Sequence, residues 1–205
     1  MNQLIEAIYY AAEAHKNHRK KNIELTPYIN HLLAVLQILS EIGVTDNDTL
    51  CASVLQDTIK DTKITYEDLY NKFGISIANI VSECSDDISK NIVTRKINQI
   101  EYARDISISA KLIKMADKLA NIVDFYKNSP VAWSDDLVYG YIVWSYMVFK
   151  NLCLVCGDKN MHNSKFGNIQ LLENKLIEMF DRHGVTNLDE EQLDFELLKY
   201  YSKIF

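Results

Sequence analysis

The sequence predicts an all-α protein that folds as a single domain. Apolar residues recur at three- and four-residue spacing along most of the chain, which is the signature of amphipathic helices. Only 6 Gly and 2 Pro occur among 205 residues, fewer turn residues than an all-β fold usually needs. A chain of this length can bury a sizeable core without disulfides.

The first predicted helices are bounded by polar and turn residues. Residues 3–16 carry apolar side chains at helical spacing, and a polar stretch then runs up to Thr26-Pro27, where the proline disfavours helix in the residue before it. A second helix covers residues 30–42 and stops at Gly43. Asp46 or Asn47 then caps a third helix.

The remaining predicted helices follow the same logic. Thr65 to Asp68 resembles a capping box, and Trp133-Ser134-Asp135 opens a long helix that reaches about residue 154. Polar loops are expected at 85–96 and 157–168. The other helices are predicted at residues 75–84, 98–105, 107–126, 169–181 and 189–203.

Composition excludes several functional classes. The net charge of -6 argues against nucleic-acid binding, which needs a basic face. No apolar run reaches the roughly 18 residues of a membrane span, and the first ten residues lack the basic region of a secretory signal. Four cysteines without a disulfide-like spacing indicate a reducing, cytoplasmic location.

Cys153 and Cys156 form a lone CxxC pair. Such a pair can bind a metal or undergo redox chemistry, but no second pair follows at zinc-site spacing. We favour the alternative that both are small apolar residues at a helix end.

A few polar residues stand out against apolar surroundings. His31 begins a helix, Gln56-Asp57 ends an apolar one, Asp61 lies one turn later, and Asp117 sits between apolar positions. A histidine and carboxylates from separate helices can form a metal site in a bundle core. From spacing alone we favour the alternative, in which they are a satisfied core histidine, a helix cap and an ion pair of Asp117 with Lys114 or Lys118 on a solvated face.

Three segments carry a family resemblance. They read TPYINH at 26–31, LQDTIKDT at 55–62 and KLIKMADKLAN at 111–121. Together they resemble the hydrolase domain of RelA/SpoT-type HD phosphohydrolases, and most closely its small stand-alone metazoan members. The resemblance implies an all-α HD-domain helical bundle at residues 1–182, with a helical extension at 183–205 packed on it.

The resemblance also implies a chemistry. Family members remove the 3′-pyrophosphate of guanosine tetra- and pentaphosphate with one Mn²⁺, and stand-alone members are also credited with removing the 2′-phosphate of NADPH. The metal ligands map onto His31, Gln56, Asp57 and Asp117. Gln56 stands where the family has a histidine, and an amide oxygen suits Mn²⁺ less well than imidazole does.

Further positions depart from the family pattern. Lys60 replaces a family glutamate at a catalytic position, which leaves Asp61 to position the attacking water, and Leu137 stands where the family has an arginine. The substrate contacts map onto Lys20, Lys21, Lys114, Asn121 and Tyr141. The sequence thus predicts a SpoT-like metal-dependent pyrophosphohydrolase impaired at Gln56 and Lys60. The alternative is an inactive nucleotide-binding or protein-interaction member of the fold.

Overall fold

The computed structural model describes residues 2–128, 130–153 and 165–204, and this part of the chain is built from helices. Within it the single β feature is an isolated bridge between Arg19 and Pro27. The elements are α1 (Asn2–Ala14), α2 (Ile29–Glu41), α3 (Asn47–Leu55), α4 (Thr58–Asp61), α5 (Tyr66–Phe73), α6 (Ile75–Cys84), α7 (Ile92–Glu101), η1 (Tyr102–Arg104), α8 (Ile108–Asn128), α9 (Asp135–Leu152), α10 (Ile169–Arg182), η3 (Val185–Asn187) and α11 (Glu190–Tyr201). The predicted all-α fold is confirmed.

Side-chain caps fix several helix starts where the sequence predicts them. The Asp46 carboxylate accepts a hydrogen bond from the Thr49 amide at the start of α3. Thr65 and Asp68 form the reciprocal capping box of α5, and Ser134 caps α9. Each cap satisfies an amide that the first helical turn leaves unpaired.

The segment from 85 to 105 differs from its prediction. We expected a loop to residue 96 and a helix over 98–105, but α7 begins at Ile92, ends at Glu101 and continues as η1. The earlier start follows from Asn91, whose side chain accepts a hydrogen bond from the Thr94 amide. The sequence also does not predict α4, because four residues are too few to show a helical period.

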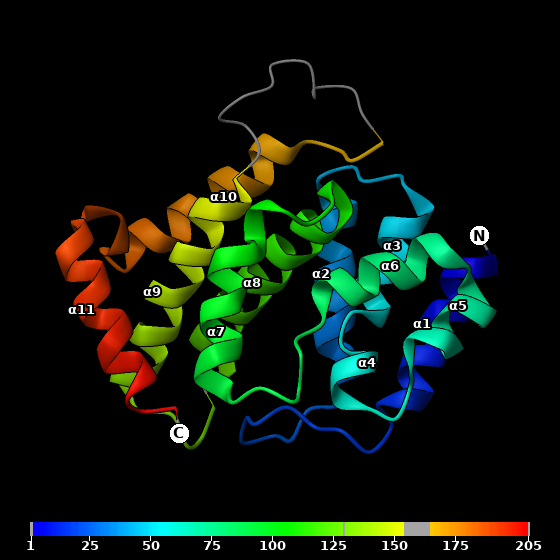
Figure 1. The fold of residues 1–205 in the computed structure, drawn as a ribbon, viewed down its shortest axis with the longest axis horizontal. Coiled ribbons are helices and arrows are strands. Elements are labelled where there is room, and N and C mark those ends of the chain that lie inside the picture. Colours follow the sequence, from blue (N-terminus) through cyan, green and yellow to red (C-terminus); the bar gives the residue numbers. More distant parts are fainter. Residues whose placement is uncertain (1, 129, 154–164, 205) are drawn as a thin grey trace.

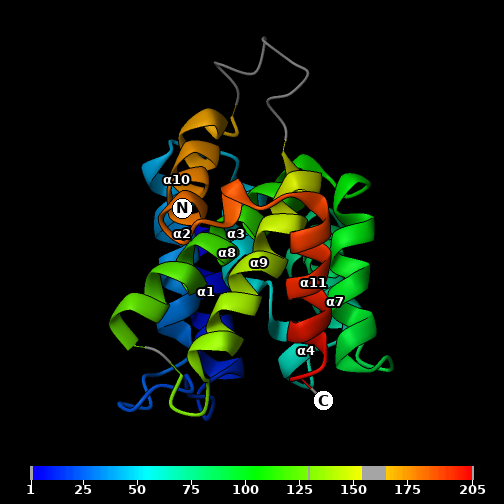
Figure 2. The same ribbon diagram turned by 90° about the vertical axis from the view of Figure 1, so that its left-hand side faces the viewer.

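Helix α8 is the centre of the bundle. It packs against α2, α3, α6, α9 and α10, and Figures 1 and 2 both show it enclosed by the other helices. Burial on several sides brings polar residues of α8 into the interior, among them Lys114 and Lys118. Buried charges need partners, so the buried polar positions of α8 indicate a functional site.

The C-terminal helices join the same core. Figure 1 shows α11, in red, alongside α9, in yellow, and Leu193, Leu197 and Tyr200 of α11 are buried. Gly140 of α9 permits this approach, since a Cβ there would lie 2.8 Å from the Tyr200 Cβ. The division of the chain at residue 182 stays a prediction.

The sequence analysis also made expectations about a membrane span and about the CxxC pair. None of the described helices has the length and apolar character to cross a membrane. Cys153 lies at the end of α9, whereas Cys156 lies outside the described residues.

Candidate functional site

A cavity of about 340 Å³ opens beside α8 and gathers most of the predicted site residues. Its walls come from the segment between α1 and α2, from α2, α7, α8 and α9, and from the junction of α3 and α4. The predicted residues that line it are Lys20, Lys21, His31, Gln56, Asp57, Lys60, Lys114, Asp117, Asn121 and Tyr141. Helices far apart in sequence therefore bring these side chains to one place.

Asp117, on α8, is the most heavily bonded acid of the cavity. Its Oδ1 accepts hydrogen bonds from His31 Nε2 and Asn121 Nδ2, both at 3.0 Å. Its Oδ2 lies 3.0 Å from the buried Lys118 ammonium. Burial alone would raise the pKa of Asp117, but Lys118 and His31 outweigh it and hold this pKa well below its usual value. Asp117 is therefore a carboxylate at neutral pH.

Asp57 also lines the cavity and is bound on both oxygens. Tyr28 donates its hydroxyl to Oδ2 at 2.9 Å, and the Lys60 ammonium lies 2.8 Å from Oδ1. Burial alone would lower the pKa of Lys60, but the charges of Asp57 and Asp61 outweigh it and raise this pKa above its usual value. Lys60 is therefore a permanent cation, and it faces Asp57.

The four predicted metal ligands line the cavity but do not form a metal-binding set. Among the described residues there is no group of three or more His, Cys, Asp or Glu that could hold a metal ion. His31 and Asp117 bond to each other, and Asp57 bonds to Lys60. Gln56 is buried, and its Nε2 has no hydrogen-bond partner among the described residues. These residues do not fit a four-ligand divalent metal site.

Asp61, the predicted water-positioning residue, does not line the cavity. It is exposed at the end of α4, with its Oδ2 3.7 Å from the Lys60 ammonium. Burial and the neighbouring charge of Asp57 raise the pKa of Asp61, although Lys60 opposes them. Asp61 thus touches the site only through Lys60.

Two lysines approach from the segment before α2. The Lys20 ammonium forms an ion pair of 2.5 Å with Asp124 of α8, and the peptide amide of Lys20 donates to the Thr26 carbonyl, so its backbone is fixed. Lys21 is exposed. One lysine is therefore held against the wall, while the other faces solvent.

Lys96 and Trp144 are site residues to which the sequence assigned no role. The Lys96 ammonium lies 3.4 Å from the centroid of a Trp144 ring and 4.9 Å from that of Tyr141. Trp144 also donates its indole N–H to the Lys96 carbonyl. Burial, aided by the like charge of Lys118, lowers the pKa of Lys96 well below its usual value. The sequence gives only a weak indication that Lys96 and Trp144 belong to the site, because each also fits an ordinary helix pattern.

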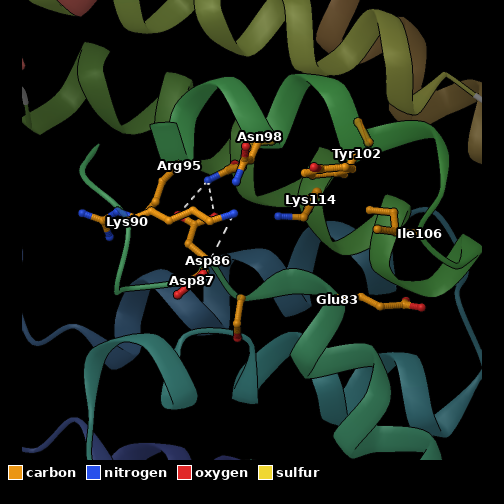
Figure 3. A pocket seen from close by; sticks show the side chains of 12 residues that line it. Glu83, Asp86, Asp87, Lys90, Arg95, Asn98, Tyr102, Ile106 and Lys114 are labelled. Carbon is orange, nitrogen blue, oxygen red and sulfur yellow. Dashed lines mark hydrogen bonds and ion pairs between the residues drawn. The ribbon is translucent and has the colours of Figure 1, made fainter. Parts of the chain in front are cut away.

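Lys114 borders a second cavity of about 240 Å³ beside α7. Figure 3 shows its side chain pointing toward Asp86 and Arg95. Its ammonium donates to the Cys84 carbonyl at 3.1 Å, and burial lowers the pKa of Lys114. Asp86, Gln99 and Lys114 line both cavities, so the two spaces are neighbours.

His15 packs on Tyr28, which lines the cavity, and its burial leads us to expect that stability depends on pH. Its ring is 2% exposed and packs on Tyr28 at 5.1 Å. Burial lowers the pKa of His15 from 6.5 to about 4, so the unfolded chain takes up a proton first as the pH falls. We expect the free energy of unfolding to decline from about pH 6.5 to pH 4. Urea unfolding at several pH values should show a shallower decline for His15→Gln than for His183→Gln, and equal declines would contradict the assignment.

The comparisons with known proteins agree with this fold. The HD domain family matches residues 7–136. The protein named guanosine-3′,5′-bis(diphosphate) 3′-pyrophosphohydrolase MESH1 is 41% identical in Xenopus tropicalis over 183 residues, which cover 89% of this chain and 95% of that protein. The human protein of the same name is 37% identical over 185 residues, covering 90% of this chain and 96% of its own.

A solved structure leads to the same group. It is described as a metazoan orthologue of SpoT that hydrolyses ppGpp and plays a role in starvation responses. It superposes with a TM-score of 0.79 at 37% identity and covers 90% of this chain and 97% of its own. The chain therefore belongs to the HD-domain family, among the small SpoT-like proteins related to MESH1.

Proposed function

We propose that this protein binds a guanosine nucleotide with a 3′-pyrophosphate and is a SpoT-type 3′-pyrophosphohydrolase with slow turnover. The observation that carries the proposal is the 340 Å³ cavity, which combines basic side chains with an aromatic wall. Relatives that share about 90% of the chain's length bear the name of this activity. Other phosphorylated nucleotides, such as NADPH, are secondary candidates.

The basic side chains supply the phosphate contacts. Lys20, Lys60 and Lys118 approach the cavity from three different segments, so they can surround a pyrophosphate rather than meet it on one side. Lysine binds phosphate as a compact point charge. Tyr141 and Trp144 offer ring faces for the base or ribose, and Asn121 offers an amide. A bound phosphate also favours the charged form of Lys96.

Hydrolysis requires water to attack the phosphorus that is bonded to the 3′-oxygen. The bond from phosphorus to the 3′-oxygen breaks, pyrophosphate leaves, and the 3′-oxygen takes a proton to become a hydroxyl. In the proposed site the lysines stabilise charge on the phosphoryl oxygens. Asp61, the predicted water-positioning residue, does not line the cavity, so slow turnover is expected without a carboxylate that orients the water. Mn²⁺ binds weakly at most, so the largest source of rate in an intact metal-dependent relative is reduced.

The remaining surroundings are proposed on composition and thiol state. Cys51 and Cys84 are free thiols, which supports a reducing cytoplasmic location. The net charge of -6 supports a small-molecule partner rather than a nucleic acid.

A second candidate function is nucleotide binding without turnover. The Lys60–Asp57 ion pair favours it, because a carboxylate bound by a lysine is less available to a metal or to water. In that case the protein would sense or sequester a phosphorylated nucleotide on an HD fold.

A turnover measurement tests the proposed function. We expect guanosine 3′,5′-bis(diphosphate) to bind, and pyrophosphate release with Mn²⁺ to stay below about 1 per second, the lower end of ordinary enzyme rates. Asp117→Asn should abolish the residual rate, which separates it from a contaminating phosphatase. A rate within the ordinary range would contradict impairment. Failure to bind the nucleotide would overturn the proposed function.

A further inference from the structure

We propose that the Lys60 ammonium takes the place of a divalent metal ion in this cavity, so that the site binds a pyrophosphate without metal. The inference deepens the proposed function and rests on it for the identity of the ligand. The chain belongs to a family of metal-dependent hydrolases, yet the residues of its own cavity do not fit a metal.

Lys60 holds a fixed position beside two aspartates. Its ammonium lies 2.8 Å from Asp57 and 3.7 Å from Asp61, and its side chain is 29% exposed. An exposed pair on a helix surface would mean little, but the Asp57 side chain is only 12% exposed. Tyr28 occupies the other carboxylate oxygen. The pair is therefore built into the cavity wall rather than laid over the surface.

Gln56 also supports the inference. It precedes Asp57 directly and lines the same cavity, but it brings an amide whose buried Nε2 has no hydrogen-bond partner in the described part of the chain. The Gln56 amide is uncharged, so it can stay buried without a bound metal ion. Its N–H groups can donate to a phosphate oxygen. Lys60 and Gln56 thus alter the site in one direction: one adds a cation, and the other replaces a metal ligand with a phosphate donor.

The charge balance of the cavity supports the inference as well. Seven lysine and arginine side chains and four aspartates line it, so positive charge outnumbers negative charge even without Lys96 and Lys114, whose burial disfavours the charged form. A divalent ion would meet repulsion from Lys60 close to Asp57. A pyrophosphate, in contrast, would neutralise the excess. The ammonium has three N–H donors, so it can hold both aspartates and still reach a phosphate.

The direct test is Mn²⁺ affinity, measured by calorimetry on the full chain. We expect unmodified protein to bind Mn²⁺ only at millimolar concentration, and Lys60→Gln to gain at least about 10-fold. Lys63→Gln is the matched control, since Lys63 is exposed nearby and does not line the cavity. Micromolar Mn²⁺ binding by unmodified protein would overturn the inference. This measurement uses unmodified protein alone, so it does not depend on whether a variant folds.

The second measurement is binding of guanosine 3′,5′-bis(diphosphate) in excess chelator. We expect unmodified protein and Lys63→Gln to bind equally with chelator and with Mn²⁺, and Lys60→Gln to lose at least about 10-fold in chelator. Binding that appears only with Mn²⁺ would reject the inference and leave the proposed function intact. Expected Mn²⁺ affinities without nucleotide binding in either condition would support the Lys60 cation and reject the proposed function.

Discussion

The double substitution Gln56→His with Lys60→Glu is expected to raise Mn²⁺ affinity by at least about 100-fold and to bring pyrophosphate release into the ordinary enzyme range. Losing even an outer-shell partner of a metal typically costs 10–100-fold in affinity. Here one change restores an imidazole ligand, while the other removes a cation 2.8 Å from Asp57. Elemental analysis and a pyrophosphate-release assay measure the two effects.

The single substitutions should not add up to the double. Lys60 lies one helical turn after Gln56 and contacts Asp57, so the two positions share a partner and couple. Lys63→Glu makes the same charge change away from the cavity and should leave metal affinity unchanged. If the double variant stays metal-free and inert, the lost arginine at Leu137 or the shape of the pocket limits the site, and nucleotide binding without turnover becomes the better account.

Gly167→Ala is expected to lower the free energy of unfolding by roughly 2–5 kcal/mol, combining backbone strain with overpacking. Gly167 has φ +72°, and a Cβ there would lie 2.4 Å from the Ile42 carbonyl oxygen and 2.7 Å from the Val44 amide nitrogen. These are backbone atoms and cannot rotate away. The segment before α10 would have to leave the loop between α2 and α3.

Gly184→Ala is the matched control for this effect. Gly184 has φ +69°, but nothing lies within 4 Å of a Cβ placed there, so only the left-handed strain of about 1–2 kcal/mol applies. Urea unfolding followed by circular dichroism gives both values. Equal losses in the two variants would show that the close approach at Gly167 relaxes at no cost.

Much of the fold could be predicted from local signals. Caps at Asp46, Thr65 and Ser134 and the apolar periods between them define helix starts without tertiary information. The segment from 85 to 105 was predicted with wrong bounds although α7 has an apolar face, because the polar residues at 85–91 run into the helix without a break in composition. The start of α7 depends on one side-chain hydrogen bond, from the Thr94 amide to Asn91.

The site could be predicted only in part, since its members are distant in sequence. His31 and Asp117 are 86 residues apart, and spacing alone favoured ordinary core contacts over a metal site. The family resemblance selected ten residues that line the cavity, but also Asp61, which does not, and it gave no role to Lys96, Lys118 or Trp144. It did not show which way Lys60 points, because a long flexible side chain can reach either solvent or Asp57. Lys118 looked like part of a solvated face, yet it is 4% exposed.

The ion pair between Lys60 and Asp57 changes how the site relates to its surroundings. A metal ion is a separate species, so its occupancy of a site depends on its free concentration and on every competing chelator. An ammonium on the same short helix is tethered, and dilution cannot remove it. The positive charge beside Asp57 is thus specified by the gene rather than drawn from the divalent-ion supply of the cell.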